Sequence, residues 1–226
     1  MIGVGTNLLF DRRAGKAGPP IPPFNKAMVD AWFMSGFSNA DKPGSITGMM
    51  GNEMALKNFA FTSESGFGEG TYEGALVFDG VDDYGMCTGL PIMDDFTLIC
   101  KREILNTSPG YVANKGLGNA GAFHFEGSIQ TIDSNSTTGV WSYGTGNRVK
   151  LEESEVSWMT KNSYNGIELK TGNLSDVEQL YLCRFSASFT KAAIYYFALY
   201  DKSLTPEEIE TEKERLNEEW LKRKTE

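Results

Sequence analysis

The sequence predicts an all-β protein, an antiparallel β-sandwich followed by one C-terminal helix. Residues 74–89, GALVFDGVDDYGMCTG, alternate in character on both sides of an aspartate-glycine turn, which is typical of paired strands. Residues 192–200, AAIYYFALY, are apolar or aromatic throughout, as in a strand that is buried on both faces. Of the 226 residues, 25 are glycine and 12% are aromatic, which is typical of short strands separated by glycine turns.

The first predicted unit is a β-hairpin. Ala75 and Val77 precede the turn at Asp79-Gly80, and Tyr84 and Met86 follow it with the same spacing. An aspartate-glycine pair between two alternating runs is a strong hairpin signal. We therefore expect the two runs to pair with each other.

The second predicted unit is a long strand near the C-terminus. Strict alternation places the odd-numbered residues 193–199 on one face and the even-numbered residues 194–200 on the other. Both sets are apolar or aromatic. We therefore expect this strand to be buried on both sides.

A helix follows that strand. Thr205 is a suitable N-cap, Pro206 suits the first helical position, and Glu208 completes a capping box. The apolar positions form one narrow stripe between charged residues, at Ile209, Leu216 and Trp220. We expect that stripe to dock on the sandwich and the rest of the helix to face water.

Three segments carry a family resemblance. Ala75–Tyr84 is similar to a phrase ALxFDGxDDY, and Ile194–Ile209 to a closing phrase IYNRALSxEEI. Tyr164-Asn165-Gly166 stands between them, at the place of a YVNG hairpin turn. These phrases are typical of the laminin-G-like branch of the concanavalin A-like lectin/glucanase superfamily, and the chain resembles members found in gut Bacteroides and their phages. The resemblance covers roughly residues 28–210 and implies an antiparallel jelly-roll sandwich.

The chain divides into three parts. Residues 1–27 form an extended arm rich in proline and glycine, residues 28–203 the lectin-like sandwich, and residues 204–226 the C-terminal helix. The prolines at 19, 20, 22 and 23 favour extended geometry and prevent a regular strand ladder. The arm is either a disordered tail or an anchor that attaches the sandwich to a larger assembly.

Charge and hydropathy exclude two classes of partner. A net charge of −9 and a pI near 4.8 argue against binding nucleic acid through phosphate contacts. The basic residues of the last helix, Lys213, Arg215 and Lys222–Lys224, suit its negative C-terminal end. No run approaches a membrane span, and residues 8–10 are too short for the apolar part of a secretory signal. We expect synthesis in the host cytoplasm without membrane insertion.

The three cysteines indicate neither a disulfide framework nor a zinc site. Cys87, Cys100 and Cys183 form no CxxC pair, and an odd number cannot pair completely within one chain. Each lies in or beside an apolar run. We expect three reduced thiols that act as small core residues.

Nothing in the sequence indicates catalysis. A retaining glycosidase needs two carboxylates about 5 Å apart, which on one strand means alternate positions such as ExDxE, and this pattern is absent. His124 is the only histidine, and no GxSxG motif accompanies it. We therefore expect that the protein is not an enzyme.

Candidate ligand-binding residues lie in the middle of the chain. Sugar sites combine aromatic faces with a few fixed polar groups. The segment GVWSYGTGNRVK offers Trp141 and Tyr143 beside Asn147 and Arg148, and His124 is a further candidate. The alternative is that Trp141 and Tyr143 belong to the core, as we expect for Trp32 and Trp158.

No cofactor is required by the sequence, although calcium has weak candidate ligands. Asp79, Asp82 and Asp83 offer carboxylate oxygens, which calcium prefers, at a spacing that is not that of an EF-hand. Turn aspartates also have a local explanation, because their side chains hydrogen-bond the turn backbone.

These observations favour a non-catalytic, lectin-like adhesion or decoration protein. The most specific interpretation is a component of a bacteriophage virion, in the capsid, a fibre or the tail, which presents the sandwich to a cell-surface glycan and is attached through residues 1–27. The alternatives are a free, cytoplasmic carbohydrate-binding protein and, third, a glycoside hydrolase with an unrecognised carboxylate pair. A homo-oligomer would protect the sandwich's edge strands.

Overall fold

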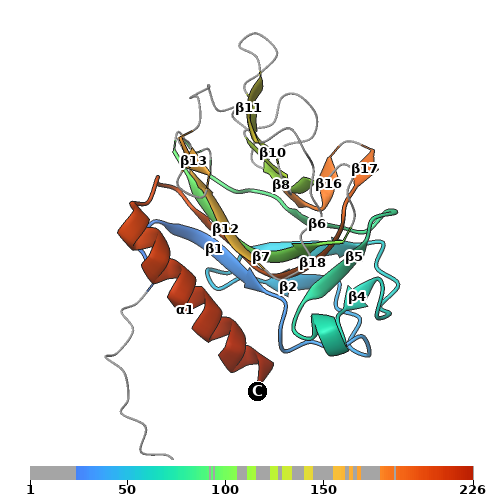
Figure 1. Ribbon diagram of the computed structural model, residues 1–226. Helices are drawn as coiled ribbons and strands as arrows, with labels where there is room; N and C mark the ends of the chain where they lie inside the picture. Colours follow the sequence, from blue (N-terminus) through green and yellow to red (C-terminus); the bar gives the residue numbers. More distant parts are fainter. Residues whose placement is uncertain are drawn as a thin grey trace, which may run out of the picture.

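In its described residues, the computed structural model of the protein contains two large antiparallel sheets, a two-stranded hairpin, a short 3-10 turn and one α-helix (Figure 1). The structure describes residues 24–91, 93, 95–105, 111–115, 123–126, 129–133, 140–144, 155–160, 163–164, 167–168, 179–185 and 187–225. Every strand pairing among these residues is antiparallel. The predicted all-β class is therefore confirmed, and the jelly-roll connectivity stays a prediction.

Sheet A contains the long central strand β18. Its strands run in the order β14 (Ile167–Glu168), β13 (Ser163–Tyr164), β12 (Glu155–Thr160), β7 (Thr97–Ile104), β18 (Lys191–Tyr200), β5 (Leu76–Asp79) and β4 (Gly66–Phe67). One side of β18 is shared, because its first half pairs with β5 and its second half with β1 (Met28–Phe33). The strands on either side of the predicted turn at residues 165–166 pair with Tyr164 opposite Ile167. Residues 165 and 166 themselves lie outside the described residues.

Sheet B lies over one face of sheet A. Its strands run in the order β11 (Val140–Gly144), β10 (Ile129–Asp133), β9 (Phe123–Glu126), β8 (Tyr111–Lys115), β15 (Leu180–Leu182), β6 (Tyr84–Cys87), β3 (Glu53–Lys57) and β2 (Ser45–Thr47). A short hairpin of β16 (Arg184–Phe185) and β17 (Ser188–Phe189) follows β15. A single 3-10 turn, η1, spans Gly70–Tyr72, and the helix α1 spans Pro206–Lys224.

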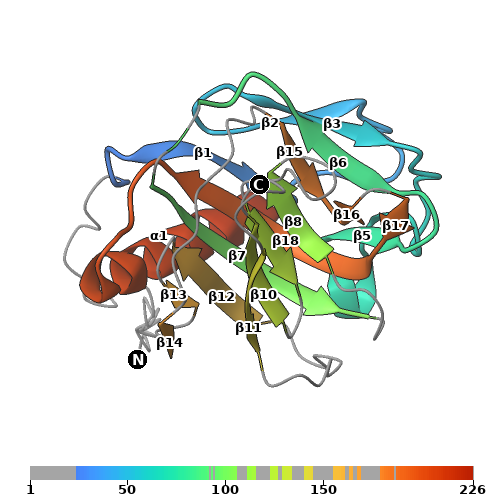
Figure 2. The same ribbon diagram turned by 90° about the horizontal axis from the view of Figure 1, so that it is seen from above.

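Two apolar layers hold these elements together. The first lies between the sheets and includes Trp32, Leu98 and Phe197 from sheet A and Met54 and Leu182 from sheet B. The second lies on the other face of sheet A, where residues of β18 and β7 pack against Ile209, Leu216 and Trp220 of α1. The order of layers is therefore α1, sheet A, sheet B (Figures 1 and 2). Sheet A is buried on both faces because it is the middle layer.

The prediction for β18 is confirmed in its burial and wrong in its strict alternation. Nine of its ten residues are buried. The pairing with β7 shifts in register between Ile194 and Tyr196, which marks a bulge at Tyr195. The bulge exchanges the two faces, so that Ala192, Ile194, Phe197 and Leu199 face sheet B, whereas Tyr195 and Tyr196 both contribute to the layer beneath α1.

The predicted hairpin at Asp79-Gly80 is wrong. Strand β5 belongs to sheet A and pairs with β18, whereas β6 belongs to sheet B and pairs with β3 and β15. The turn at residues 80–83 therefore carries the chain from one sheet to the other. A hairpin within one sheet and a connection between two sheets both need alternating strands joined by a glycine turn. Only the pairing partners of the two strands distinguish these cases.

The helix begins as predicted. Thr205 accepts a hydrogen bond from the Glu208 backbone N–H, and the Glu208 side chain accepts one from the Thr205 backbone N–H, which completes the capping box. Ile209, Leu216 and Trp220 are buried, as expected. Glu212 is the exception to the prediction that the remaining residues face water, because its side chain is 1% exposed.

Glu212 is buried because several donors surround its carboxylate. Its Oε2 accepts a hydrogen bond from the Tyr200 hydroxyl at 2.9 Å, its Oε1 one from the Asn25 backbone N–H at 3.2 Å, and Arg215 pairs with it. A hollow of about 230 Å³ lies beside this carboxylate and is lined by Asn25 and the first turns of α1. Residues 24–27, assigned to the arm by sequence, thus contact the helix. Residues 1–23 lie outside the described residues.

The remaining core predictions are confirmed. Cys87, Cys100 and Cys183 are buried free thiols, and burial raises the pKa of Cys87 to about 11 and of Cys100 to about 12. Trp32 and Trp158 are also buried. Within the described part of the chain, the helix that the fold contains is too polar to cross a membrane.

Candidate functional site

The backbone register of sheet B aligns one row of directly opposed residues across its strands. The register of the eight strands sets this row as Ser45, Ala55, Met86, Tyr181, Asn114, His124, Thr131 and Ser142. The neighbours of Tyr181 along β15, Leu180 and Leu182, belong to the core between the sheets. Because alternate residues of a strand lie on opposite faces, Tyr181 and its direct partner Met86 lie on the outer face.

The register separates the predicted ligand residues. The backbone of His124 on β9 pairs with Asn114 of β8, which in turn pairs with Tyr181. Trp141 and Tyr143 lie on β11, where their backbones pair with Ile132 and Gln130 of β10. Asn147 and Arg148 lie outside the described residues. The ligand role of these residues stays a prediction.

A cluster of three rings and a guanidinium lies beside this row. The Arg184 guanidinium is 4.4 Å from the centroid of the Tyr84 ring, 5.8 Å from that of Phe189 and 5.9 Å from that of Tyr181. The Tyr84 ring lies 6.4 Å from Tyr181 and 6.3 Å from Phe189. Tyr84, Phe189 and Arg184 are all partly exposed, so the cluster forms part of the surface. We name it the Arg184 cluster.

Cys183 explains why Arg184 reaches this cluster. In an uninterrupted strand Arg184 would lie on the same face as Leu182, which points to the core. Cys183 instead has a φ of 58°, in the left-handed region that is uncommon for residues other than glycine. This turn interrupts the alternation and brings Arg184 to the Tyr181 side, while Thr190 N–H bonds the Cys183 carbonyl to close the following hairpin.

Sequence reasoning missed the Arg184 cluster. The sequence predicted Cys183 as a core residue and placed Tyr84 in a hairpin strand. No local pattern reveals a left-handed cysteine, so the sequence offered no signal for the cluster.

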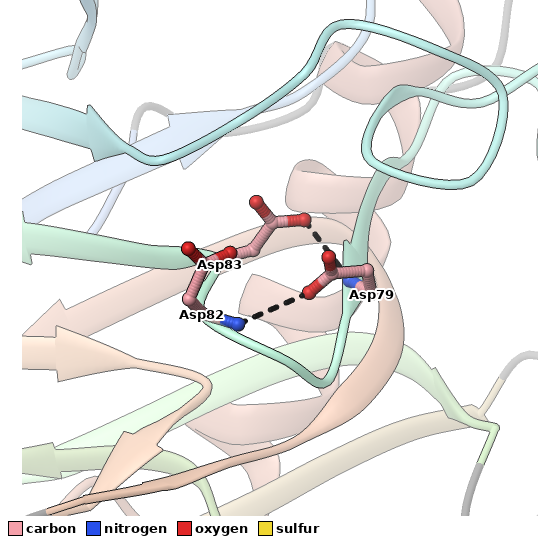
Figure 3. A group of neighbouring side chains, drawn as sticks. All are labelled: Asp79, Asp82 and Asp83. Atoms are coloured by element: carbon pink, nitrogen blue, oxygen red, sulfur yellow. Dashed lines mark hydrogen bonds between the residues drawn. The ribbon is translucent and has the colours of Figure 1, made fainter.

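We name Asp79, Asp82 and Asp83 the acidic turn, which connects β5 with β6. As predicted, its aspartate side chains hydrogen-bond the backbone of the turn. Asp79 Oδ1 accepts hydrogen bonds from the backbone N–H groups of Val81 at 2.7 Å and Asp82 at 3.4 Å. Asp83 Oδ2 accepts one from the Asp79 N–H at 3.0 Å (Figure 3). The Asn58 side chain donates to the Asp82 carbonyl at 2.9 Å, which ties the turn to a second loop.

Two features make the acidic turn unusual. One oxygen from each carboxylate lies within 4.8 Å of the others, a grouping that fits a metal ion. Asp83 is fully buried, and its Oδ1 has no hydrogen bond within the described structure. Burial raises the pKa of Asp83 from 3.8 to about 6, against the hydrogen bonds from the Asp79 backbone and the Ser65 side chain. A cation with oxygen ligands, such as calcium, would offset that burial.

Gly80 allows the turn to lie close to β18. It has a φ of +78°, and a Cβ built on it would lie 2.8 Å from both the backbone nitrogen and the Cβ of Lys191. Lys191 pairs with Asp79 at the start of β18. Glycine is therefore required here both by conformation and by space.

Comparison with known proteins shows the fold. No family model and no curated protein matches the chain. A sialidase of Trypanosoma rangeli in complex with 2,3-difluoro-KDN is similar with a TM-score of 0.56 and 16% identity, over 87% of this chain and 33% of that chain. The same sialidase with 2,3-difluorosialic acid, as a covalent intermediate, gives 0.56 and 15% over 92% and 35%.

A second kind of protein shares the architecture. The binding domain of botulinum neurotoxin serotype D is similar with a TM-score of 0.55 and 12% identity, over 83% of this chain and 51% of that chain. The chain thus spans about a third of the sialidase and about half of the toxin binding domain. At these identities the similarity concerns the fold alone.

Proposed function

We propose that the protein is a non-catalytic, glycan-binding β-sandwich whose ligand surface is the outer face of sheet B. The observation that carries the proposal is the asymmetry of the layers. The helix α1 covers the outer side of sheet A, whereas the outer face of sheet B carries the partly exposed rings of Tyr84 and Phe189 beside Arg184. Partly exposed rings beside polar groups are the usual surface for sugar recognition.

The Arg184 cluster is the described part of this face that suits a sugar. Its Tyr84 and Phe189 rings are partly exposed, and their centroids lie 6.3 Å apart. Exposed aromatic rings are a usual surface for the apolar face of a sugar ring. The similarity to a sialidase solved with sialic acid derivatives supports a sugar ligand by analogy of fold.

The more specific proposal is an adhesion or decoration protein of a bacteriophage virion, made in the host cytoplasm. It rests on the laminin-G-like, concanavalin A-like resemblance and on the position of the arm. Asn25 contacts Glu212 of α1, so residues 24–27 lie on the side of the molecule opposite the proposed ligand face. An arm attached to an assembly on that side leaves the outer face of sheet B directed outward.

The experiment is a glycan array probed with the full chain and with a variant that lacks residues 1–23, each with and without calcium. We expect both proteins to bind the same glycans and only the full chain to associate with larger assemblies or with itself in light scattering. Absence of glycan binding by both proteins would refute the lectin role. Hydrolysis of a bound glycan, followed by release of reducing sugar, would refute the non-catalytic role.

A further inference from the structure

The solvent-facing side of α1 carries a row of glutamates. Exposed carboxylates recur three or four positions apart along one side of the helix, at Glu207, Glu210, Glu214 and Glu218. We name these four residues the acidic helix face. Glutamates four residues apart repel each other and destabilise a helix. Within the described part of the chain, Glu210 is the one member of this face with an ion pair, to Lys213 at 2.8 Å. The other three carboxylates therefore stand at the surface without a countercharge there.

The hollow of about 230 Å³ beside Glu212 adjoins this face. Glu207 belongs to both, and Glu208, Glu212 and Arg215 also line the hollow. The Arg215 side chain is 10% exposed, and its Nε–H has no hydrogen-bond acceptor within the described residues. A buried donor without an acceptor is destabilising. A basic peptide segment would supply both missing partners, a positive charge beside Glu207 and a carbonyl oxygen beside Arg215.

The neighbouring cations do not neutralise this region. Lys202 pairs with Glu208 at 2.9 Å, and Arg215 pairs with Glu212. Lys26 is not among the residues that line the hollow. From residue 206 to residue 219 the helix contains seven glutamates against one lysine and one arginine. The first two thirds of α1 therefore keep a negative charge.

The arm contains the complementary charge. Arg12, Arg13 and Lys16 stand close together with one acidic neighbour, Asp11, in a chain whose net charge is −9. We name these three cations the basic arm residues. They belong to the segment that leads to Asn25, and Asn25 forms the wall of the hollow opposite α1. Three cations thus match the three glutamates of the acidic helix face that have no ion pair among the described residues.

The spacing between the basic arm residues and the hollow favours a second copy of the chain. Lys16 is nine residues before Asn25, and four prolines lie between them. Prolines favour extended geometry, and nine residues at about 3.1 Å each span about 28 Å. Laid along its own helix, a segment of that length would pass Glu218, about 17 Å from Glu207, and reach the basic last turn, Lys222–Lys224. The acidic helix face of a neighbouring copy carries no such restriction.

We propose that the acidic helix face and the adjoining hollow bind the basic arm residues of a second copy of this chain. The arm cations pair with the exposed glutamates, and a backbone carbonyl of the arm accepts the hydrogen bond from Arg215 Nε. Because each copy has one arm and one acidic helix face, reciprocal exchange closes a dimer and successive exchange closes a ring. The inference rests on the proposed attachment role of the arm and adds its partner. It does not involve the proposed glycan face, because α1 lies on the other side of sheet A.

The test reverses the charge on each side of this contact in the full chain. The arm variant carries three substitutions, Arg12→Glu, Arg13→Glu and Lys16→Glu. The face variant carries Glu207→Lys and Glu214→Lys. Sedimentation velocity over a series of protein concentrations measures self-association, and circular dichroism with thermal unfolding checks that each variant is folded.

The matched control carries Glu64→Lys and Glu69→Lys. It makes the same change of net charge as the face variant, at two exposed glutamates outside α1. A milder face variant, Glu207→Gln with Glu214→Gln, removes the two charges without reversing them. It replaces the face variant if the lysines at the start of the helix prevent folding.

We expect the wild type and the control to self-associate equally, and more weakly as salt is added. The arm variant and the face variant should each self-associate at least roughly tenfold more weakly, because like charges then meet. An equal mixture of these two variants should associate again, because the negative arm of one fits the positive face of the other. In a mixture of isotope-labelled and unlabelled wild type, carbodiimide should couple Lys16 of one copy to a glutamate of α1 in another.

Four results would overturn the inference. They are a monomeric wild type, unchanged self-association in either folded reversed variant or in the milder face variant, a mixture of the two reversed variants that stays monomeric, and coupling of Lys16 confined to single copies. The last result would place the arm on its own helix. Glycan binding by a monomeric wild type would leave the glycan-binding function standing, whereas self-association without glycan binding would overturn that function and keep the arm contact.

Discussion

The buried carboxyl of Asp83 predicts an unusual pH dependence of stability. Burial raises its pKa in the folded chain from 3.8 to about 6. Between these pH values the unfolded chain has released this proton and the folded chain has kept it, so the unfolded state binds fewer protons. The contribution of Asp83 to stability is therefore most favourable below about pH 3.8, declines as the pH rises to about 6, and is lowest above that.

The magnitude follows from the size of the pKa change. One pKa unit corresponds to about 1.4 kcal/mol, so a rise from 3.8 to about 6 corresponds to about 3 kcal/mol. The variant Asp83→Asn removes the ionisable group and keeps an acceptor for the Asp79 N–H. Relative to the wild type, Asp83→Asn should gain about 3 kcal/mol of unfolding free energy between pH 4 and pH 7.

The assay is urea denaturation of both proteins across that pH range, without divalent ions. The difference between the two unfolding free energies cancels the contributions of all other titrating groups. Val81→Ala is the matched control, because Val81 is exposed in the same turn and carries no ionisable group, so its difference from the wild type should not vary with pH in this way. A wild-type to Asp83→Asn difference that is constant from pH 4 to pH 7 would refute the reasoning.

Three further predictions concern the acidic turn and the helix. Calcium bound by the acidic turn should raise the free energy of unfolding by about 3 kcal/mol at a hundredfold excess over Kd. The thermal midpoint should then rise and the stability should depend less on pH. An unchanged midpoint would argue against a calcium site. Gly80→Ala should lose about 2 kcal/mol in urea denaturation, because its φ is +78° and Lys191 is too close. Glu212→Gln should lower the free energy of unfolding by roughly 3 kcal/mol, because the ion pair with Arg215 is broken. Ultraviolet difference spectroscopy should show that Tyr200 becomes exposed to solvent. A loss of stability below about 1 kcal/mol would contradict this prediction.

The sequence predicted correctly those features that depend on residues close together along the chain. The capping box at Thr205 and Glu208 and the buried stripe of α1 follow from side chains within a few residues of one another, so the sequence sufficed. The burial of β18 and of the three cysteines followed in the same way from apolar composition. The need for glycine at the turn after Asp79 belongs only in part to this group, because its backbone angle is local whereas the closeness of Lys191 is not.

The candidate site depended on contacts that no local pattern contains. The sequence predicted Trp141 and Tyr143 as ligand residues, whereas the partly exposed rings that the structure describes, Tyr84 and Phe189, meet only through the pairing of β6 with β15 and the hairpin that follows β15. The Arg184 cluster joins residues a hundred positions apart through a left-handed Cys183.

The sequence by itself determined the class of fold, the helix and its cap, and the residues that must be buried, because these follow from backbone preferences and side-chain hydrophobicity along short stretches. Tertiary structure alone decided that β5 and β6 belong to different sheets, that a bulge at Tyr195 exchanges the faces of β18, and that Glu212 is buried. The physical reason is that strand pairing and the burial of a charge depend on partners distant in sequence, such as β18 for β5 and Tyr200 and Asn25 for Glu212.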